Sequence, residues 1–114
     1  MIRARVTRAH QVVYADPIAF RAGDELRLGR RDSEYPGWIW ASAPDGKEGW
    51  VPEDVLAIDG DRGRALGDYT ARELAVEAGD EVLVDRELHG WAWVRDARGD
   101  EGWIPRAHLA PAPT

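Results

Sequence analysis

The chain has 114 residues, a net charge of −6 and no cysteine, which excludes disulfide bonds and thiolate metal sites. Residues 59–114 carry most of the acidic excess, and this argues against nucleic-acid binding, because phosphate contacts need a basic surface. No apolar run approaches the roughly 20 residues that span a bilayer. MIRARVTRAH at the start lacks the apolar segment of a signal peptide. We therefore expect a cytoplasmic protein that binds neither nucleic acid nor membrane.

One tryptophan-rich segment occurs twice. GWIWASAPDGKEGWVP at residues 37–52 recurs as GWAWVRDARGDEGWIP at residues 90–105, and the two copies hold all six tryptophans. An internal repeat indicates one structural unit built twice. Between the copies, DGDRGR has no apolar side chain and is rich in Gly and Asp. We therefore predict a first domain over 1–58, a linker over 59–64 and a second domain over 65–114.

The first domain is predicted to open with a short edge strand at residues 3–8, with Val6 facing inward. A long excursion follows over 9–23. In it, Ile18 and Phe20 stand two residues apart and therefore face the same side of an extended segment. A strand with alternating leucines and a polar loop then lead to the repeated segment.

Each copy of the repeated segment is predicted to form a β-hairpin. In the first copy, Pro-Asp-Gly at 44–46 suits a three-residue loop with glycine in the left-handed region. That register pairs Trp40 with Trp50 and Ile39 with Val51, so a tryptophan face is separated from an aliphatic face. A two-residue turn would mix the faces. The second copy gives the same division, with the pairs Trp93–Trp103 and Ala92–Ile104.

The first domain is expected to end with one helical turn and a closing strand over 53–58. The second domain repeats this order of elements. Its long excursion, 67–80, has Leu74 and Val76 in the places of Ile18 and Phe20. Short strands, frequent Gly and Pro turns and the lack of a long helix indicate small β-barrels. We therefore predict an all-β chain of two tandem five-stranded barrels with short 3-10 turns.

The second domain resembles an SH3 domain. ALGDY at 65–69 stands where that family has Ala-Leu-Tyr-Asp-Tyr, and ELAVEAGDEVLV at 73–84 is similar to its Glu-Leu-Ser-Phe…Gly-Asp stretch. GWAWVR and EGWIPRAHL resemble the family's tryptophan pair and its Gly-x-Ile-Pro ending. Residues 9–56 are similar but more divergent. The arrangement also resembles small tandem SH3-domain proteins of bacteria, and it implies two tandem SH3-like barrels.

The resemblance also implies a site for polyproline-type peptides between aromatic side chains of each domain. The implied ligand-binding residues of the second domain are Tyr69, Trp91 and Pro105, the acidic Glu73 or Asp68 for a ligand Arg or Lys, and His108 at the family's last tyrosine. Those of the first domain are Trp38 and Pro52, with Tyr14 nearby. Gly67, Gln11 and Val13 stand at motif tyrosines, so we expect both sites to differ from those of the family.

Neither a catalytic nor a metal-binding pattern is present in the sequence. His10, His89 and His108 lack metal-ligand spacing. Ser33 and Ser42 belong to no nucleophile motif. We therefore expect a protein that is not an enzyme and needs no cofactor or metal.

Two classes of function remain open. In the first, the chain is a peptide-binding or protein-interaction module whose partner is a protein or peptide, Pro-rich or basic. In the second, it is a structural or assembly protein whose tryptophan faces are used in packing between the domains or in a homodimer. Binding of a small ligand such as a cell-wall fragment is a further reading of the same surfaces.

Overall fold

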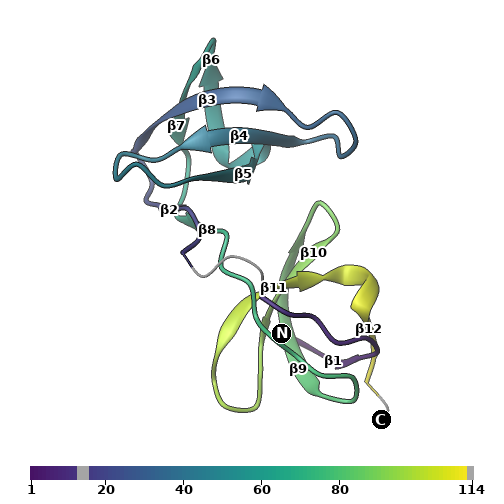
Figure 1. Cartoon of the computed structure of the whole chain (residues 1–114). Helices are drawn as coiled ribbons and strands as arrows, with labels where there is room; N and C mark the ends of the chain where they lie inside the picture. Colours follow the sequence, from purple (N-terminus) through teal and green to yellow (C-terminus); the bar gives the residue numbers. More distant parts are fainter. Residues whose placement is uncertain (13–15, 113–114) are drawn as a thin grey trace. The chain divides into compact units, whose positions relative to one another are not determined.

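The computed structural model describes residues 1–12 and 16–112, and these residues form short β-strands and two single-turn 3-10 helices (Figure 1). No helix in the described part of the chain is long and apolar enough to cross a membrane. The elements in chain order are β1 (Ile2–Val6), β2 (Ala19–Phe20), β3 (Glu25–Arg31), β4 (Trp38–Ser42), β5 (Glu48–Pro52), η1 (Glu53–Val55), β6 (Leu56–Asp59), β7 (Arg62–Ala65), β8 (Tyr69–Thr70), β9 (Glu81–Leu88), β10 (Trp91–Arg95), β11 (Glu101–Pro105), η2 (Arg106–His108) and β12 (Leu109–Pro111).

The chain divides into two compact units that do not coincide with its sequence repeats. The central unit is Asp16–Arg72, and the terminal unit combines Met1–Ala15 with Glu73–Thr114. The central unit holds a five-stranded sheet in the order β5-β4-β3-β7-β6 and the pair β2-β8. The terminal unit holds a second five-stranded sheet in the order β11-β10-β9-β1-β12. The all-β prediction, with its short 3-10 turns, is therefore confirmed.

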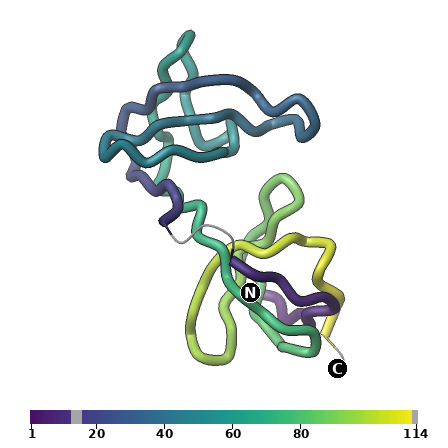
Figure 2. Tube along the Cα trace, in the orientation of Figure 1, coloured from purple at the N-terminus to yellow at the C-terminus, as the bar shows by residue number. Residues whose placement is uncertain are grey.

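Each unit takes its first strand from the other repeat. In the terminal unit, β1 pairs antiparallel with β9 and with β12, so the purple N-terminal strand lies between green and yellow strands in Figure 1. In the central unit, β7 pairs antiparallel with β3 and with β6. Figure 2 shows the same exchange along the Cα trace, where the purple N-terminal segment lies with the green and yellow segments of the second repeat. The repeats have thus exchanged their first strands within one chain.

The turn between β6 and β7 explains this exchange. Asp59 pairs with Arg62, which leaves only Gly60 and Asp61 to connect the two strands. Gly60 has φ of +63°, a value that glycine adopts without steric cost and that tight hairpins require. A two-residue connection forces its flanking strands to pair with each other, so β7 occupies the position that β1 would otherwise take beside β6.

This hairpin corrects the predicted domain boundaries. Residues 59–64 are not a linker, since they form the end of β6, the turn and most of β7. The predicted domains 1–58 and 65–114 describe the repeats, whereas the compact units are residues 16–72 and residues 1–15 with 73–114. The sequence DGDRGR looks like a linker because it has no apolar side chain, but β7 lies between β3 and β6 and faces the core with the buried Gly63 while its arginines are exposed.

The predicted inward residues form the cores. Val6 and Ile18 are each only 1% exposed, and Phe20 is also buried. The core of the terminal unit consists of Ala4, Val6, Leu74, Val76, Val82, Ala92, Val94, Ile104 and Leu109. Because β1 supplies two of these side chains, the terminal unit buries its aliphatic face only when the N-terminal strand is in place.

Both hairpins have the predicted register. Trp40 pairs with Trp50, and Ile39 pairs with Val51. In the second hairpin the pairs are Trp93–Trp103 and Ala92–Ile104. Gly46 and Gly99 both have a positive φ and lie in three-residue loops. This is the loop length that separates the tryptophan face from the aliphatic face. The aliphatic residues Ile39, Ala41, Val51, Ala92, Val94 and Ile104 are all buried.

Candidate functional site

The predicted ligand-binding residues are divided between the two units. Glu73, Trp91, Pro105 and His108 lie in the terminal unit, while Trp38, Pro52, Asp68 and Tyr69 lie in the central unit. Tyr14 lies outside the described residues. The sequence predicts Tyr69, Trp91 and Pro105 in one domain, whereas the exchange of strands puts Tyr69 in a different unit from the other two. The site at Trp91 therefore has a different composition from the predicted one.

Trp91 and Pro105 are neighbours on adjacent strands. They are Cα partners at one end of the β10–β11 ladder, and both side chains are half-buried. The equivalent pair in the central unit, Trp38 and Pro52, holds the same position in the β4–β5 ladder. In each unit the proline is the last residue of the strand and the N-cap of the following 3-10 helix, with an extended backbone that its fixed φ permits.

His10 completes the terminal site and was not identified from the sequence. Its Nε2 lies 2.7 Å from the Glu73 Oε1, in a part-buried hydrogen bond. Its ring meets those of Trp91 and His108 edge to face, with centroid separations of 5.8 Å and 5.9 Å. We call this set the Trp91 cluster, and its members, all half-buried, are His10, Glu73, Trp91, Pro105 and His108.

The strand register shows why His10 was missed. Val6 pairs with Leu109 in the terminal unit, as Ala65 pairs with Leu56 in the central unit. Counting onward from these pairs makes His10 the equivalent of Tyr69. The pairing of the next segments agrees, since His10 bridges to Val76 and Tyr69 pairs with Phe20.

The equivalents of Tyr69 and Gly67 in the first repeat are thus His10 and Arg8, and not Val13 and Gln11 as the sequence comparison placed them. Val13 itself lies outside the described residues. The sequence comparison thus placed these equivalents three residues too far along the first repeat. Pairing the predicted strands end to end could have found the correct register.

A glycine holds Glu73 in the cluster. The Glu73 segment lies parallel to the chain at Trp103, and the Leu74 N–H donates to the Trp103 carbonyl oxygen over 3.2 Å. A Cβ on the neighbouring Gly102 would lie 2.8 Å from the carbonyl carbon of Glu73 and from the Leu74 nitrogen. That contact is too close for real Cβ atoms, so Gly102 permits the approach that brings Glu73 to His10.

His108 is held by the backbone of the N-terminal strand. The Thr7 N–H donates to the His108 carbonyl oxygen over 2.7 Å. Its Nδ1 is buried and forms no hydrogen bond of good geometry within the described residues, although backbone groups of Arg8 and Ala9 lie close to the ring. Burial lowers the pKa of His108, and the positive charges of Arg8 and His10 lower it further. His108 therefore favours its neutral form, in which the ring presents an apolar and weakly polar surface beside His10.

The central unit uses the equivalent positions differently. Tyr69 is only 6% exposed, and its ring packs on Phe20 with centroids 5.5 Å apart. Pro52 is fully buried. Pro17 takes the position of Glu73, three residues before Phe20 as Glu73 is three before Val76. Trp38 is half-buried like Trp91, but Tyr69 is buried where its equivalent His10 is half-buried, so the central unit offers less accessible aromatic surface there.

Asp68, a predicted acidic ligand residue, has a local role. Its Oδ1 accepts a hydrogen bond of 2.9 Å from the Ala22 N–H. This bond connects the segment before β8 to the segment after β2. Asp68 therefore fixes the loop of the central unit, and a ligand cation would have to share its carboxylate.

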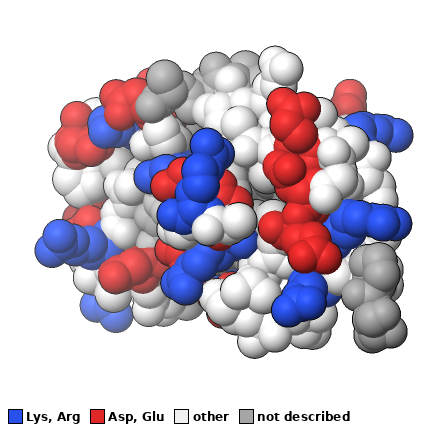
Figure 3. All heavy atoms as spheres, turned by 90° about the horizontal axis from the view of Figure 1, so that it is seen from below, with Lys and Arg blue, Asp and Glu red and all other residues white. Residues whose placement is uncertain are grey.

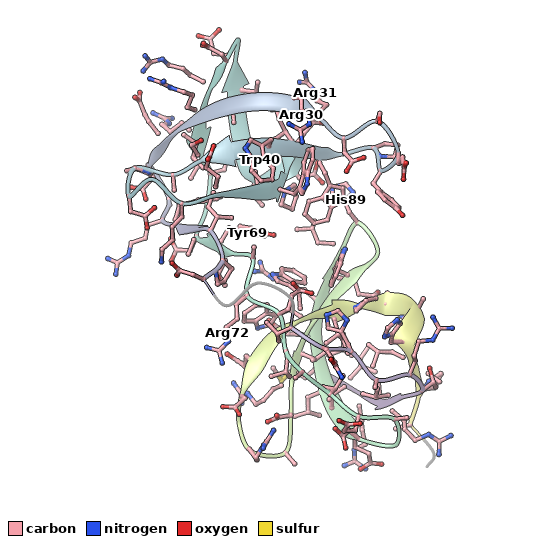
Figure 4. All side chains as sticks on the ribbon, in the orientation of Figure 1. Arg30, Arg31, Trp40, Tyr69, Arg72 and His89 are labelled. Carbon is pink, nitrogen blue, oxygen red and sulfur yellow. The ribbon has the colours of Figure 1, made fainter. Side chains whose placement is uncertain are left out.

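The remaining tryptophans form two cross-strand pairs on the outer faces of the hairpins. Trp40 meets Trp50, and Trp93 meets Trp103, edge to face with centroids 5.3 Å apart in both cases. The Arg30 guanidinium lies 5.7 Å and 5.3 Å from the Trp40 and Trp50 rings, and Figure 4 shows Arg30 beside Trp40. Arg86 lies 5.4 Å from the Trp103 ring. Each pair thus receives a cation from its neighbouring strand.

Many of the charged side chains form ion pairs with side chains of opposite charge. Figure 3 shows both basic and acidic side chains on the face in view, with some of the acidic ones gathered in a band. In the terminal unit, Arg95 is 2.9 Å from Glu101, and Arg106 pairs with Glu87. Among the described residues no group of three or more His, Asp or Glu is arranged to hold a metal ion.

A comparison with protein families matches the chain twice. The model of the variant SH3 domain covers residues 3–59 and again residues 62–112. The chain belongs to the variant SH3 domain family. SH3 domains are in general protein-interaction modules, and this chain has two of them in tandem. The matches follow the sequence repeats, so each compact SH3 unit of the structure combines the first strand of one repeat with the remaining strands of the other.

Proposed function

We propose that the chain is a non-enzymatic interaction module that binds an extended, Pro-rich peptide segment of a partner protein at the Trp91 cluster. The observation that carries this proposal is the arrangement of Trp91, His10 and His108, three half-buried rings on three different segments of one unit. Pro105 lies beside Trp91. Partly exposed rings next to a proline suit a polyproline-type helix, which loses little entropy on binding.

The state of Glu73 favours a Pro-rich ligand over a basic one. Its carboxylate already accepts a hydrogen bond from His10 or pairs with it, at 2.7 Å. A ligand Arg or Lys would have to displace or share that partner. The neutral character of His108 likewise favours apolar contact over charge recognition.

The central unit is the weaker candidate for this role. Tyr69 and Pro52 are buried, and Pro17 replaces the carboxylate. We propose that the central unit supports the structure and that Trp38 contributes a minor surface.

The test is an NMR titration of the intact chain with a Pro-rich peptide. We expect the Trp91 indole N–H signal to shift in a saturable way and the Trp38 signal to shift less. A peptide with each proline replaced by alanine is the control. Trp91→Ala should abolish binding while Trp38→Ala retains it. If no Pro-rich or basic peptide moves the Trp91 signal of the folded protein, the peptide proposal is wrong.

A structural role is the second candidate for the outer tryptophan pairs. Trp103 is only 4% exposed, and arginines already cover the rings at Trp40, Trp50 and Trp103. We propose that these pairs brace the hairpins. Acrylamide quenching decides, since bracing predicts poor quenching of Trp50 and Trp103 in variants that keep only one cross-strand pair, whereas a binding surface predicts strong quenching that a partner protein suppresses.

A further inference from the structure

The exchange of first strands leaves each unit with an arm from the other repeat. The first arm runs from β1 to His10 and closes the terminal unit. The second arm, β7 and β8, closes the central unit. The strand order permits a second arrangement, in which each repeat closes on its own arm. The two arrangements differ in their side-chain contacts, because His10 of the first arm and Tyr69 of the second arm contact different residues in each.

In the observed arrangement, a side chain of each arm has a suitable partner in the unit that the arm closes. His10 reaches Glu73 at 2.7 Å in the terminal unit. Tyr69 packs on Phe20 in the central unit, with centroids 5.5 Å apart. Each contact joins residues from different repeats.

In the other arrangement these contacts would be lost. His10 would meet Phe20 and Pro17, neither of which has a side-chain hydrogen-bond acceptor. A part-buried imidazole without an acceptor is unfavourable, because it has lost water and gained no partner. Tyr69 would meet Glu73 and the smaller Val76, and its ring would lose the aromatic contact with Phe20.

We propose that His10 and Glu73 are a positioning pair that selects the first arm for the terminal unit, so that the surface at Trp91 is assembled from both repeats. Its role in ligand binding rests on the function proposed above, but the selection itself does not. The short turn at Gly60 and Asp61 acts in the same direction, so the test must separate the two causes.

Disulfide trapping can separate them, because the chain has no cysteine of its own. Arg5 is the Cα partner of Ala110 in the observed arrangement. Ala57 is the partner of Arg64, the residue equivalent to Arg5, so it would face Arg5 in the other arrangement. A chain with Arg5→Cys, Ala57→Cys and Ala110→Cys therefore reports its own arrangement, since position 5 can bond to either of the others.

The decisive variant inserts about 12 Gly and Ser residues after Gly60, which gives a flexible reach of roughly 20 Å and removes the turn constraint. We expect the 5–110 disulfide to exceed the 5–57 disulfide at least tenfold by peptide mapping. Glu73→Ala in this background should reduce the ratio by about tenfold, and Glu73→Gln, which keeps an acceptor, by less. A dominant 5–57 bond, or an unchanged ratio in Glu73→Ala, would overturn the proposal.

A second experiment applies if the lengthened chain does not fold. With the native turn and only Arg5→Cys and Ala110→Cys, His10→Glu should reduce the yield of the 5–110 bond several-fold by placing two carboxylates together. His10→Glu combined with Glu73→Lys should restore it. Failure of the reversed pair to restore the yield contradicts selection by this pair. Neither experiment uses a peptide, so a failed peptide titration leaves these results unaffected.

Discussion

The His10 Nε2 lies 2.7 Å from the Glu73 Oε1, although 63 positions separate the two residues in the chain. The bond joins the end of the N-terminal arm to the segment that enters the terminal unit from the second repeat. Both side chains are largely shielded, with exposures of 14% and 16%. Water therefore screens this pair less than an ion pair on the open surface.

Removing either partner should destabilise the terminal unit. We expect His10→Ala and Glu73→Ala each to lower the free energy of unfolding by about 1–2 kcal/mol, because each leaves a part-buried polar group without its partner. The double variant should cost clearly less than the sum of the two. Urea denaturation of the three variants measures this coupling. Strictly additive losses would show that the two side chains do not interact in solution.

Gly102 should tolerate no side chain. Gly102→Ala places a Cβ 2.8 Å from backbone atoms of Glu73 and Leu74, and backbone cannot move aside cheaply. We expect a loss of about 1–3 kcal/mol, typical of overpacking, with a displaced Trp91 indole signal in the NMR spectrum.

Two other glycines provide matched controls for this variant. Gly49→Ala, the equivalent change in the central unit, meets the Ile18 Cγ2 at 3.0 Å and should cost less, since a side-chain methyl can shift. Gly67→Ala meets no atom within 4 Å and should be close to neutral. A neutral Gly102→Ala would mean that the Glu73 segment does not approach β11 as closely as the structure shows.

The sequence predicted the hairpins because their signals are local. The Pro-Asp-Gly loop and the alternation of tryptophan with small aliphatic residues specify one register, and Trp40 pairs with Trp50 as that register requires. The SH3-like barrels could likewise be predicted from motif order. Each of these inferences depends on contacts within a few dozen residues of one repeat.

The composition of the site could not be predicted in the same way. Sequence similarity shows that two segments are equivalent, but not which of two equivalent arms closes a given sheet. That choice depends on the length of the turn at Gly60 and on side chains such as His10 and Glu73, which meet only after folding. The sequence therefore assigned Tyr69 to the wrong unit and did not identify His10 as a site residue.

The lowered pKa of His108 should make the protein less stable in acid. Burial is the main cause, followed by the charges of Arg8 and His10, and nearby backbone groups of Arg8 and Ala9 oppose the shift. In the unfolded chain the imidazole takes up its proton near pH 6.5. Below that pH the unfolded state binds more protons than the folded state, so the free energy of unfolding falls as the pH falls toward the folded-state pKa.

Denaturation between pH 8 and pH 5 should reveal this dependence. We expect the part of the decline due to His108 to disappear in His108→Gln. Arg8→Gln removes one of the two positive charges and should raise the pKa of His108 in an NMR titration. A His108 pKa above the ordinary value in the native protein would contradict the burial of its ring.

The arginines above the tryptophan pairs should contribute modestly to stability. Arg30 approaches both rings of the Trp40–Trp50 pair, so Arg30→Ala should lower the free energy of unfolding by about 0.5–1 kcal/mol. It should also raise acrylamide quenching of the central-unit tryptophans. Arg86→Ala, above Trp103 in the terminal unit, is the matched variant and should change quenching there instead. If Arg30→Ala leaves quenching unchanged, the guanidinium does not cover the rings in solution.

The central unit should fold as an isolated fragment. Residues 16–72 contain all five strands of its sheet, the β2–β8 pair and the Gly60 turn. Its compact fold depends on contacts that lie within this range, so a fragment 16–72 should unfold cooperatively in urea and keep the indole signals of Trp40 and Trp50.

A fragment of the first repeat that ends at residue 58 lacks β7, the strand that pairs with β3 and β6 in the intact chain. It can close its sheet only with its own N-terminal arm, which would bring His10 to Phe20 and Pro17, so we expect it to be less stable than 16–72. The opposite order of stability, or an unfolded 16–72 fragment, would show that the exchanged strand is not what completes the central unit.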